Sequence, residues 1–404
     1  MQLSQRARIA PPSPIRKLVP LADAAKARGV RVYHLNIGQP DIPTPEVMWE
    51  AVRQAKIEVL SYSPSGGIPE FLAALRRYYA RYGIELGVDQ LITTTAGSEA
   101  ILFALGVVCD PGEEVLIPEP LYANYTGYAA LLGVRVVPAP ARPEDGYALP
   151  PRAALEARIT ERTRAILLCN PCNPTGRVYT REELETVADL ARRHDLFFIA
   201  DEVYREFCYA DQAPVSVLRL PEIAERAIMV DSLSKRFSIC GARIGCLASR
   251  NRDVIGAAMK FAQARLSPPT LGQIMGIAGL ELPLTYFDRT VAEYRRRRDV
   301  VLEELARIPG VICQPPQGAF YIMAKLPVPD AEDFVRWMLT DFELDGETTM
   351  MAPGNGFYAT PGEGRSEVRI AYVLEEAKLR RAMRIVAAGL GAYQAAPTPA
   401  TEKR

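Results

Sequence analysis

Residues 227–245 read AIMVDSLSKRFSICGARIG, and this stretch carries the strongest indication of the fold. Its first residues, Ala227 to Val230, are apolar without polar alternation, which is typical of a strand covered on both faces of a sheet. Similar runs recur at Leu91 to Thr95, Val115 to Ile117, Val134 to Val137, Ala165 to Leu168, Leu196 to Ile199 and Ile244 to Ala248. Together these runs predict an α/β fold with a mostly parallel seven-stranded sheet and helices on both faces.

The segments between the runs show the apolar spacing of helices, at 68–81, 98–108 and 181–193. The last of them has the clearest beginning, because Thr180 and Glu183 form the T-x-x-E pattern of a capping box. Helices between consecutive strands are what a parallel sheet needs for its crossover connections.

The domain organisation changes near residue 285. Residues 46–284 contain all the strand runs and are expected to form a large domain. A charged helix is predicted from 283 to 306, and shorter strands and helices follow, so we expect residues 285–394 to form a smaller C-terminal α+β domain. Residues 1–45, rich in proline and basic groups, are expected to form an N-terminal arm and part of the small domain, and 395–404 a disordered tail.

The composition argues for a small-molecule partner. The chain has 404 residues, 49% hydrophobic and 24% charged, and 48 basic side chains balance 48 acidic ones. A net charge of zero gives no general attraction to nucleic acid or to an anionic membrane surface. No apolar stretch approaches the ~20 residues of a membrane-spanning helix, and MQLSQRARIA at the start lacks the apolar centre of a signal peptide. We therefore expect a cytoplasmic protein without a nucleic-acid or membrane partner.

Cysteine and histidine usage narrows the possible chemistry. Seven cysteines, an odd number scattered over a long chain, do not form a disulfide framework and are expected to be reduced. Cys169 and Cys172 make a C-x-x-C motif, but no second pair lies nearby to complete a zinc site. His34 and His194 are the only histidines of the sequence, so a Ser-His-Asp triad or a histidine-rich metal site has almost no histidine to draw on. No metal is expected.

Lys235 stands in the serine-rich turn after the 227–230 run. Its amine can condense with an aldehyde, and partly desolvated surroundings near a cation help it to lose its proton. Ser232 and Ser234 add hydroxyl donors, and Arg243 adds a planar cation suited to phosphate oxygens. These groups together suit pyridoxal phosphate, an aldehyde that carries a phosphate.

Two other interpretations of this turn stay open. Most lysines lie on solvated surfaces, since lysine is rarely buried without a partner. Ser232 and Lys235 also form the S-x-x-K pair of serine β-lactamases and penicillin-binding proteins, although the S-D-N and K-T-G motifs of that class are missing from the sequence. Acyl transfer at Ser232 is therefore an alternative hypothesis.

Further strand ends carry matching chemistry, and ligands of open α/β sheets bind at the carboxyl ends of strands. Gly97 and Ser98 open a helix after the 91–95 run, where free backbone amides can hold a phosphate. The alternative is an ordinary glycine turn in which Ser98 caps the helix. Asn173 lies in the turn N-P-C-N-P-T-G after the 165–168 run, where its amide can reach a phenolic oxygen.

Asp201 follows the 196–199 run, and Tyr204 stands three residues further on. A carboxylate at a strand end is often only a turn former, but here it can face a pyridinium nitrogen and keep it protonated, as an electron-withdrawing ring requires. Tyr204 could reach the same phenolic oxygen as Asn173.

These motifs together resemble the class I and II aminotransferases of fold type I. The lysine segment fits the pyridoxal-phosphate attachment pattern of that family at every constrained position, and N-P-x-N-P-T-G with D-E-V-Y adds specificity. A-G-S-E and V-R-I-A-Y are weak motifs by themselves. The resemblance runs from about Ser13 to about Leu390 and implies that the large domain, 46–284, binds the cofactor.

The resemblance implies a role for each matching residue around the cofactor. Lys235 matches the lysine that holds the cofactor covalently, Asp201 the partner of the ring nitrogen, and Asn173 with Tyr204 the pair at the ring hydroxyl. Lys235, Asp201 and Tyr204 are thus the candidate catalytic residues. The residues that match the phosphate-binding segments are Gly97, Ser98, Glu99, Ser232, Ser234 and Arg243.

Two tyrosines match further family positions. Tyr122, in P-L-Y-A-N-Y, matches the aromatic side chain that stacks on the cofactor ring, although a core tyrosine is an equal possibility. Tyr62, in Y-S-P-S-G-G, matches the tyrosine that reaches the phosphate of a neighbouring subunit. That match implies a homodimer with shared active sites.

Substrate recognition depends on fewer residues. Arg369 resembles the family arginine that clamps the α-carboxylate in a bidentate pair, with Asn173 beside it. Asn36 and Gly38, in L-N-I-G-Q-P-D, resemble the segment that closes over the substrate. Arg265 lies near, but offset from, the arginine with which aspartate-specific members bind a side-chain carboxylate, which puts dicarboxylate specificity in doubt.

The resemblance implies ping-pong transfer of the α-amino group of an L-amino acid to a 2-oxo acid, with 2-oxoglutarate expected as acceptor. The main alternative is the same fold and cofactor catalysing β-elimination, substitution or cyclisation of an amino acid, because the first proton abstraction is common to all of them. An aminotransferase-like regulator is a second alternative, but regulators of that kind carry an added DNA-binding domain, and the chain has no basic patch for one.

Overall fold

The large sheet contains the seven strands predicted from the apolar runs. The computed structural model describes residues 1–209 and 214–395. Its strands are β2 (Leu91–Thr94), β3 (Glu114–Glu119), β4 (Arg135–Pro140), β5 (Thr163–Cys169), β6 (Phe197–Asp201), β7 (Ala227–Ser232) and β8 (Gly245–Ala248), in the order β2-β8-β7-β6-β5-β3-β4. β8 runs antiparallel to both of its neighbours, and the remaining pairs are parallel. The predicted α/β fold with a mostly parallel seven-stranded sheet is confirmed.

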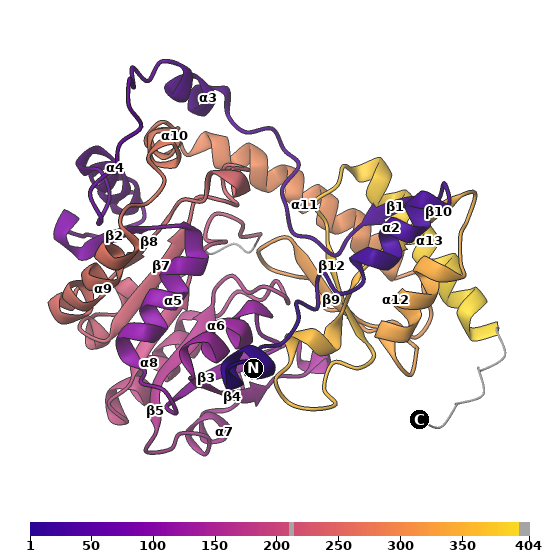
Figure 1. Cartoon of the computed structure of the whole chain (residues 1–404). Helices are drawn as coiled ribbons and strands as arrows, with labels where there is room; N and C mark the ends of the chain where they lie inside the picture. Colours follow the sequence, from indigo (N-terminus) through magenta and orange to yellow (C-terminus); the bar gives the residue numbers. More distant parts are fainter. Residues whose placement is uncertain (210–213, 396–404) are drawn as a thin grey trace.

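Helices cover both faces of this sheet, which explains the continuous apolar strands (Figure 1). Alternate residues of β5 point to opposite sides, so that Ala165 and Leu167 join one buried cluster while Ile166 and Leu168 join another. The first cluster includes α5 (Ala96–Val108), α6 (Asn124–Leu132) and α9 (Arg252–Arg265); the second includes α4 (Pro69–Ala80), α8 (Arg181–Arg193) and α10 (Thr270–Leu280). The short helices α3 (Glu46–Arg53) and α7 (Arg152–Glu156) complete this part, α3 packing on α10 and α7 on α8.

The capping box predicted before α8 is present. The Thr180 hydroxyl accepts a hydrogen bond from the Glu183 amide, and the Glu183 carboxylate accepts one from the Thr180 amide. Two otherwise unpaired backbone donors are thereby satisfied at the helix start. The predicted and observed bounds of this helix coincide because the signal is local.

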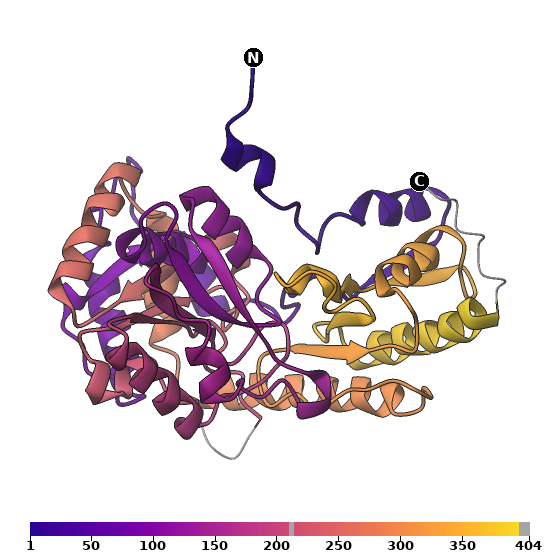
Figure 2. The same ribbon diagram turned by 90° about the horizontal axis from the view of Figure 1, so that it is seen from below.

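A second, smaller group of elements follows the long helix α11 (Thr285–Leu305), which reaches from the large sheet to this group (Figure 2). β9 (Tyr321–Lys325), β11 (Ala352–Pro353) and β12 (Glu367–Ala371) form an antiparallel sheet, with α12 (Ala331–Thr340) and α13 (Glu376–Ala395) beside it. Of the predicted tail, 395–404, only Ala395 lies within the described residues, where it ends α13.

The N-terminal segment contributes more to the core than an arm would. α1 (Gln5–Ile9) is exposed, but α2 (Val19–Ala27) buries Ala22 and Ala25, and β1 (Arg31–His34) pairs in parallel with β10 (Glu347–Met350). Through β1 the N-terminal segment joins β10 of the smaller group of elements, while α1 forms its exposed part. The partner strand lies at the other end of the chain, so no local pattern could indicate the pairing.

None of the helices in residues 1–209 and 214–395 is long and apolar enough to cross a membrane.

Candidate active site

A cavity of about 560 Å³ opens where β5, β6 and β7 end and α5 begins. Residues from the N-terminal segment, among them Arg16 and Ile37, close one side of it. Most of the residues predicted for the site lie in its wall, namely Gly38, Gly97, Ser98, Tyr122, Asn173, Asp201, Tyr204, Ser232, Ser234, Lys235 and Arg243. The tertiary structure therefore brings together residues as distant in the chain as Gly38 and Arg243.

Lys235 follows β7 and reaches across the cavity. Its Nζ donates a hydrogen bond to the Gly38 carbonyl oxygen at 2.9 Å and lies 3.7 Å from the Cys240 sulfur. Gly38 is required at its place, because a Cβ there would lie 1.8 Å from the Tyr321 hydroxyl oxygen. The backbone carbonyl that orients the Lys235 amine thus belongs to a position where only glycine fits.

One end of the cavity is built for an anion. α5 begins there with Ala96, Gly97 and Ser98, whose backbone amides have no partner within the helix. The Ser232 hydroxyl donates to the Ser234 hydroxyl at 2.8 Å on the facing turn. Helix amides and adjacent hydroxyls are the donors that phosphate oxygens accept from.

Arg243 adds a cation to this end. Its backbone lies in the left-handed region with φ of 53°, and its Nη1 donates to the Cys240 carbonyl at 3.0 Å. Within the described part of the chain it forms no ion pair with a carboxylate. An arginine in a cavity wall without an acidic partner, beside helix amides and serine hydroxyls, fits a phosphate group.

Asp201 is the last residue of β6 and faces the cavity from its buried wall. One carboxylate oxygen accepts a hydrogen bond from the Tyr125 hydroxyl at 2.6 Å, and the other accepts one from the Val203 amide at 3.3 Å. Burial raises the pKa of Asp201 to about 6, and the Tyr125 and Val203 hydrogen bonds oppose that rise. The ionised form of Asp201 is therefore disfavoured unless a positive charge lies beside it, and a protonated ring nitrogen of a ligand would supply that charge.

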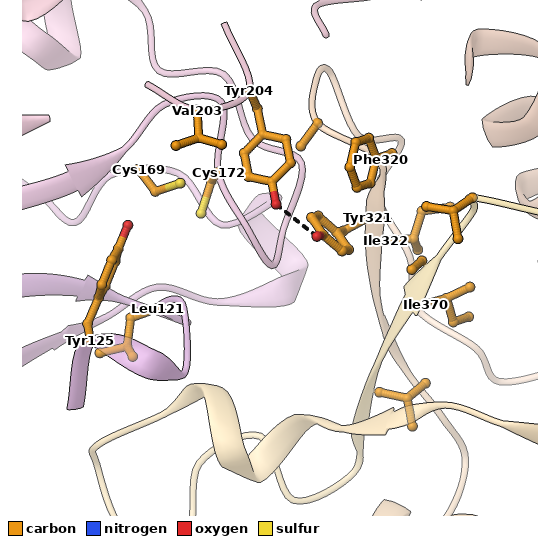
Figure 3. Close-up of a cluster of buried hydrophobic side chains, with 14 of the residues drawn as sticks. Leu121, Tyr125, Cys169, Cys172, Val203, Tyr204, Phe320, Tyr321, Ile322 and Ile370 are labelled. Atoms are coloured by element: carbon orange, nitrogen blue, oxygen red, sulfur yellow. Dashed lines mark hydrogen bonds between the residues drawn. The ribbon is translucent and has the colours of Figure 1, made fainter. Parts of the chain in front are cut away.

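Two tyrosines stand in the middle of the cavity wall. The Tyr204 hydroxyl lies 2.8 Å from the Tyr321 hydroxyl (Figure 3), and burial raises the pKa of Tyr204 well above its usual value. The Tyr122 hydroxyl accepts a hydrogen bond from Asn124 Nδ2 at 2.8 Å, and its ring contacts that of Tyr125 edge to face. Neutral phenols offer donors to a ligand and an aromatic face for stacking.

Arg369, on β12, lies behind Asn173 and is only 1% exposed. Its Nη1 donates to Asn173 Oδ1 at 2.9 Å and its Nη2 to the Asn36 carbonyl at 2.6 Å. Nε has no hydrogen-bond partner, and no carboxylate of the described residues pairs with the guanidinium. Burial lowers its pKa, so an anionic ligand would stabilise the charged form.

Of the residues discussed from the sequence, Asn36 and Arg369 lie behind the cavity wall, and Glu99, Arg265 and Tyr62 lie elsewhere. Glu99 accepts a hydrogen bond from the Thr95 amide at 2.7 Å and pairs with Arg265 at 3.2 Å, away from the cavity wall. Arg265 also donates to the Ser65 and Thr93 carbonyls, so its guanidinium is engaged within the protein. Tyr62 is 78% exposed and does not line the cavity.

Sequence reasoning missed several residues of the site. Tyr125 and Tyr321 lie behind the cavity wall and contact Asp201 and Tyr204; they have no motif of their own, and only these tertiary contacts reveal them. Arg16 lies before α2 and enters the cavity wall from the far end of the chain. Cys240 was part of the quoted lysine segment, but a thiol within a binding pattern gives no separate signal.

Comparisons with known proteins agree with this arrangement. The family model described as aminotransferase class I and II matches residues 30–386. The aspartate/prephenate aminotransferase of Thermus thermophilus is 31% identical over 396 residues, which cover 96% of this chain and 99% of that protein. The aspartate aminotransferase of Bacillus subtilis is 30% identical over 388 residues, 93% of this chain and 97% of that protein. The solved alanine aminotransferase of Pyrococcus furiosus superposes with a TM-score of 0.89 at 30% identity, covering 97% of this chain and all of that one.

The raised pKa of Asp201 predicts that the folding stability of the ligand-free protein falls as pH rises. An unfolded aspartate titrates near ~3.9, whereas burial brings Asp201 to about 6 in the folded protein. The contribution of Asp201 to the free energy of unfolding is therefore fully present below the pKa of the unfolded chain, and it is lost as pH rises through about 6. We expect Asp201→Asn to gain stability relative to the unmodified protein between pH 4 and pH 7, as measured by urea unfolding. Asp110→Asn, an exposed carboxyl after α5, is the control; equal pH profiles for both variants would contradict the prediction.

Proposed function

This chain belongs to the class I and II aminotransferases and is an enzyme of amino-group transfer, and from this premise we propose its cofactor, substrates and residue roles. The proposed cofactor is pyridoxal 5'-phosphate, which that family uses. The proposed reaction moves the α-amino group of an L-amino acid to a 2-oxo acid, with 2-oxoglutarate as the expected acceptor, in a ping-pong sequence. The relatives favour transfer over elimination, substitution or cyclisation.

A single observation carries this proposal: unpaired charges and donors surround the one lysine of the cavity. Arg243, which has no carboxylate partner among the described residues, and the α5 amides suit the phosphate, and Asp201, whose pKa is raised by burial, suits a ring cation. We assign Asn173 and Tyr204, which line the same cavity, to the ring hydroxyl, and Tyr122 to stacking. Each part of the cofactor thus has a complementary group, and Lys235 supplies the amine that would hold its aldehyde.

The cofactor, when bound, supplies an aldehyde that takes up the amino group and a ring that withdraws electrons from the substrate's Cα. Lys235 is proposed to remove and return the proton at that carbon as general base and acid. Asp201 stabilises positive charge on the ring nitrogen, and its hydrogen bond from Tyr125 orients the carboxylate. Arg369 binds the α-carboxylate, with Asn173 and Asn36 fixing the plane of its guanidinium, and Gly38 leaves room for the Tyr321 ring.

A homodimer with shared active sites is also proposed. Between residues 46 and 62 the exposed side chains include Val47, Trp49, Ile57, Val59, Leu60 and Tyr62. Such an exposed apolar segment next to α3 supports an interface with a second copy of the chain. In the proposed dimer Tyr62 reaches the phosphate of the neighbouring subunit. A cytoplasmic location stays a prediction.

Replacement of Lys235 tests the assignment of the catalytic amine. Lys235→Ala should lower the transamination rate by at least ~10²-fold, since the general base is lost. Borohydride reduction of the unmodified protein should fix the cofactor on the peptide that contains Lys235, and the variant should not be labelled. Lys260→Ala, an exposed lysine of α9, is the matched control. Full transamination by Lys235→Ala would refute the assignment.

Arg369→Lys tests substrate binding. Lysine keeps the charge but not the planar fork, so we expect kcat/KM for every amino donor to fall about 10- to 100-fold, chiefly through KM. Steady-state kinetics with several donors measure this change. Arg365→Lys, an exposed arginine next to β12, should behave like the unmodified enzyme. Unchanged KM values in Arg369→Lys would place the carboxylate elsewhere.

The dimer predicts a sedimentation mass twice the chain mass of 44.5 kDa. Val59→Asp places a charge on the exposed apolar segment and should yield monomers, because an unpaired charge in an interface is costly. Leu131→Asp, at another exposed apolar side chain on α6, is the control and should stay dimeric. A monomeric unmodified protein would end this part of the proposal.

A further inference from the structure

The C-x-x-C motif lies beside the catalytic cavity. Cys169 ends β5 and is the register partner of Asp201 on β6, while Cys172 lies in the turn that leads to Asn173. Cys169 is 6% exposed and Cys172 is 5% exposed, and Cys169 lines the cavity. Figure 3 shows the two sulfur atoms near each other, below Val203 and Tyr204.

The two thiols interact with each other and with the turn. Cys169 Sγ donates to the Pro171 carbonyl at 3.3 Å and accepts from the Asn173 amide at 3.4 Å. The side-chain interaction with Cys169 is the main cause that lowers the pKa of the Cys172 thiol, and Thr175 adds to it. Burial raises the pKa of Cys169. The two neighbouring thiols thus differ in acidity, with Cys172 the more acidic of the pair.

We propose that Cys169 and Cys172 form a modification site for hydroperoxides, which convert the two thiols into a disulfide at the edge of the active site. One sulfur takes an oxygen atom from hydrogen peroxide, and the first water is released. The second thiol then attacks that sulfur, and the oxygen leaves as a second water. Two thiols and one peroxide therefore give one disulfide and two waters, and no further reductant or oxidant is needed.

The cavity gives the reagent access and also connects the modification to substrate binding. Hydrogen peroxide is small enough to enter a cavity of about 560 Å³, and Cys169 forms part of its wall. The Asn173 backbone amide donates a hydrogen bond to the Cys169 sulfur, and the Asn173 side chain accepts one from Arg369. Closing the disulfide draws the 169–173 turn together and alters this contact. The effect on catalysis rests on the proposed function of Arg369, whereas formation of the disulfide does not.

Peptide mass measurement tests the chemistry directly. Trypsin cleaves after Arg164 and Arg177, and the peptide 165–177, AILLCNPCNPTGR, contains Cys169 and Cys172 and no other cysteine. The enzyme, purified with its cofactor, is treated with hydrogen peroxide, alkylated and digested without reductant. We expect this peptide to lack alkyl groups and to be lighter by its two thiol hydrogens, and dithiothreitol to restore both alkylation sites. A doubly alkylated peptide after peroxide would overturn the proposal.

Kinetics test the connection to the active site. Peroxide should raise the KM for the amino donor about tenfold in the unmodified enzyme, the effect of disturbing one hydrogen bond, and dithiothreitol should reverse it. Cys172→Ser cannot form the disulfide and should keep its KM under the same treatment. Cys313→Ser, which removes a thiol that does not line the cavity, should respond like the unmodified enzyme.

The possible failures are distinguishable. A disulfide in the peptide together with an unchanged KM would overturn the link between the modification and Asn173. An untreated enzyme that transfers no amino group would instead contradict the proposed function, whatever the peptide masses show.

Discussion

The turn that carries Lys235 depends on one buried carboxylate, Asp231. Its side chain accepts hydrogen bonds from the Ser232 amide and the Tyr79 hydroxyl, both at 2.7 Å, and forms an ion pair with Arg236. Asp231 and Arg236 are 0% and 1% exposed. Because removal of one partner of such a pair leaves a buried charge, at a cost of about 3–5 kcal/mol, the direction in which the chain leaves β7 is strongly determined. Lys235 points into the cavity while Arg236, its neighbour, points into the core.

The site combines this rigid sheet edge with groups from the second sheet. Arg369 comes from β12 and is held by Asn173 after β5, so its guanidinium bridges the two parts of the chain. Tyr321, from β9, likewise contacts Tyr204 and limits the space above Gly38. In the proposed assignment, the groups for the cofactor and those for the substrate therefore come mainly from different elements, and a change in how these elements pack is expected to alter substrate binding more than cofactor binding. The dithiol at the end of β5 lies where the two sets of groups meet.

Elements with a local signal could be predicted from the sequence. The strands of the large sheet were recognisable because burial on both faces removes polar alternation, and α8 because Thr180 and Glu183 cap its beginning. The pairing of β1 with β10 was not recognisable, since strand register depends on contacts between distant segments. The same reason explains Tyr125, Tyr321 and Arg16, whose importance comes from what they touch. Glu99 shows the reverse: it stands within a motif, but its carboxylate turns to Arg265.

The sequence by itself determined the fold class and the chemical groups available, because strand burial, helix caps and the lysine segment are encoded in short stretches of neighbouring residues. Only the tertiary structure decided how these groups are charged and paired. It buried Asp201 beside a tyrosine, left Arg243 and Arg369 without a carboxylate partner among the described residues, and set Cys172 next to Cys169, which lines the cavity. Desolvation and long-range contact produce these properties, and neither is a function of sequence spacing.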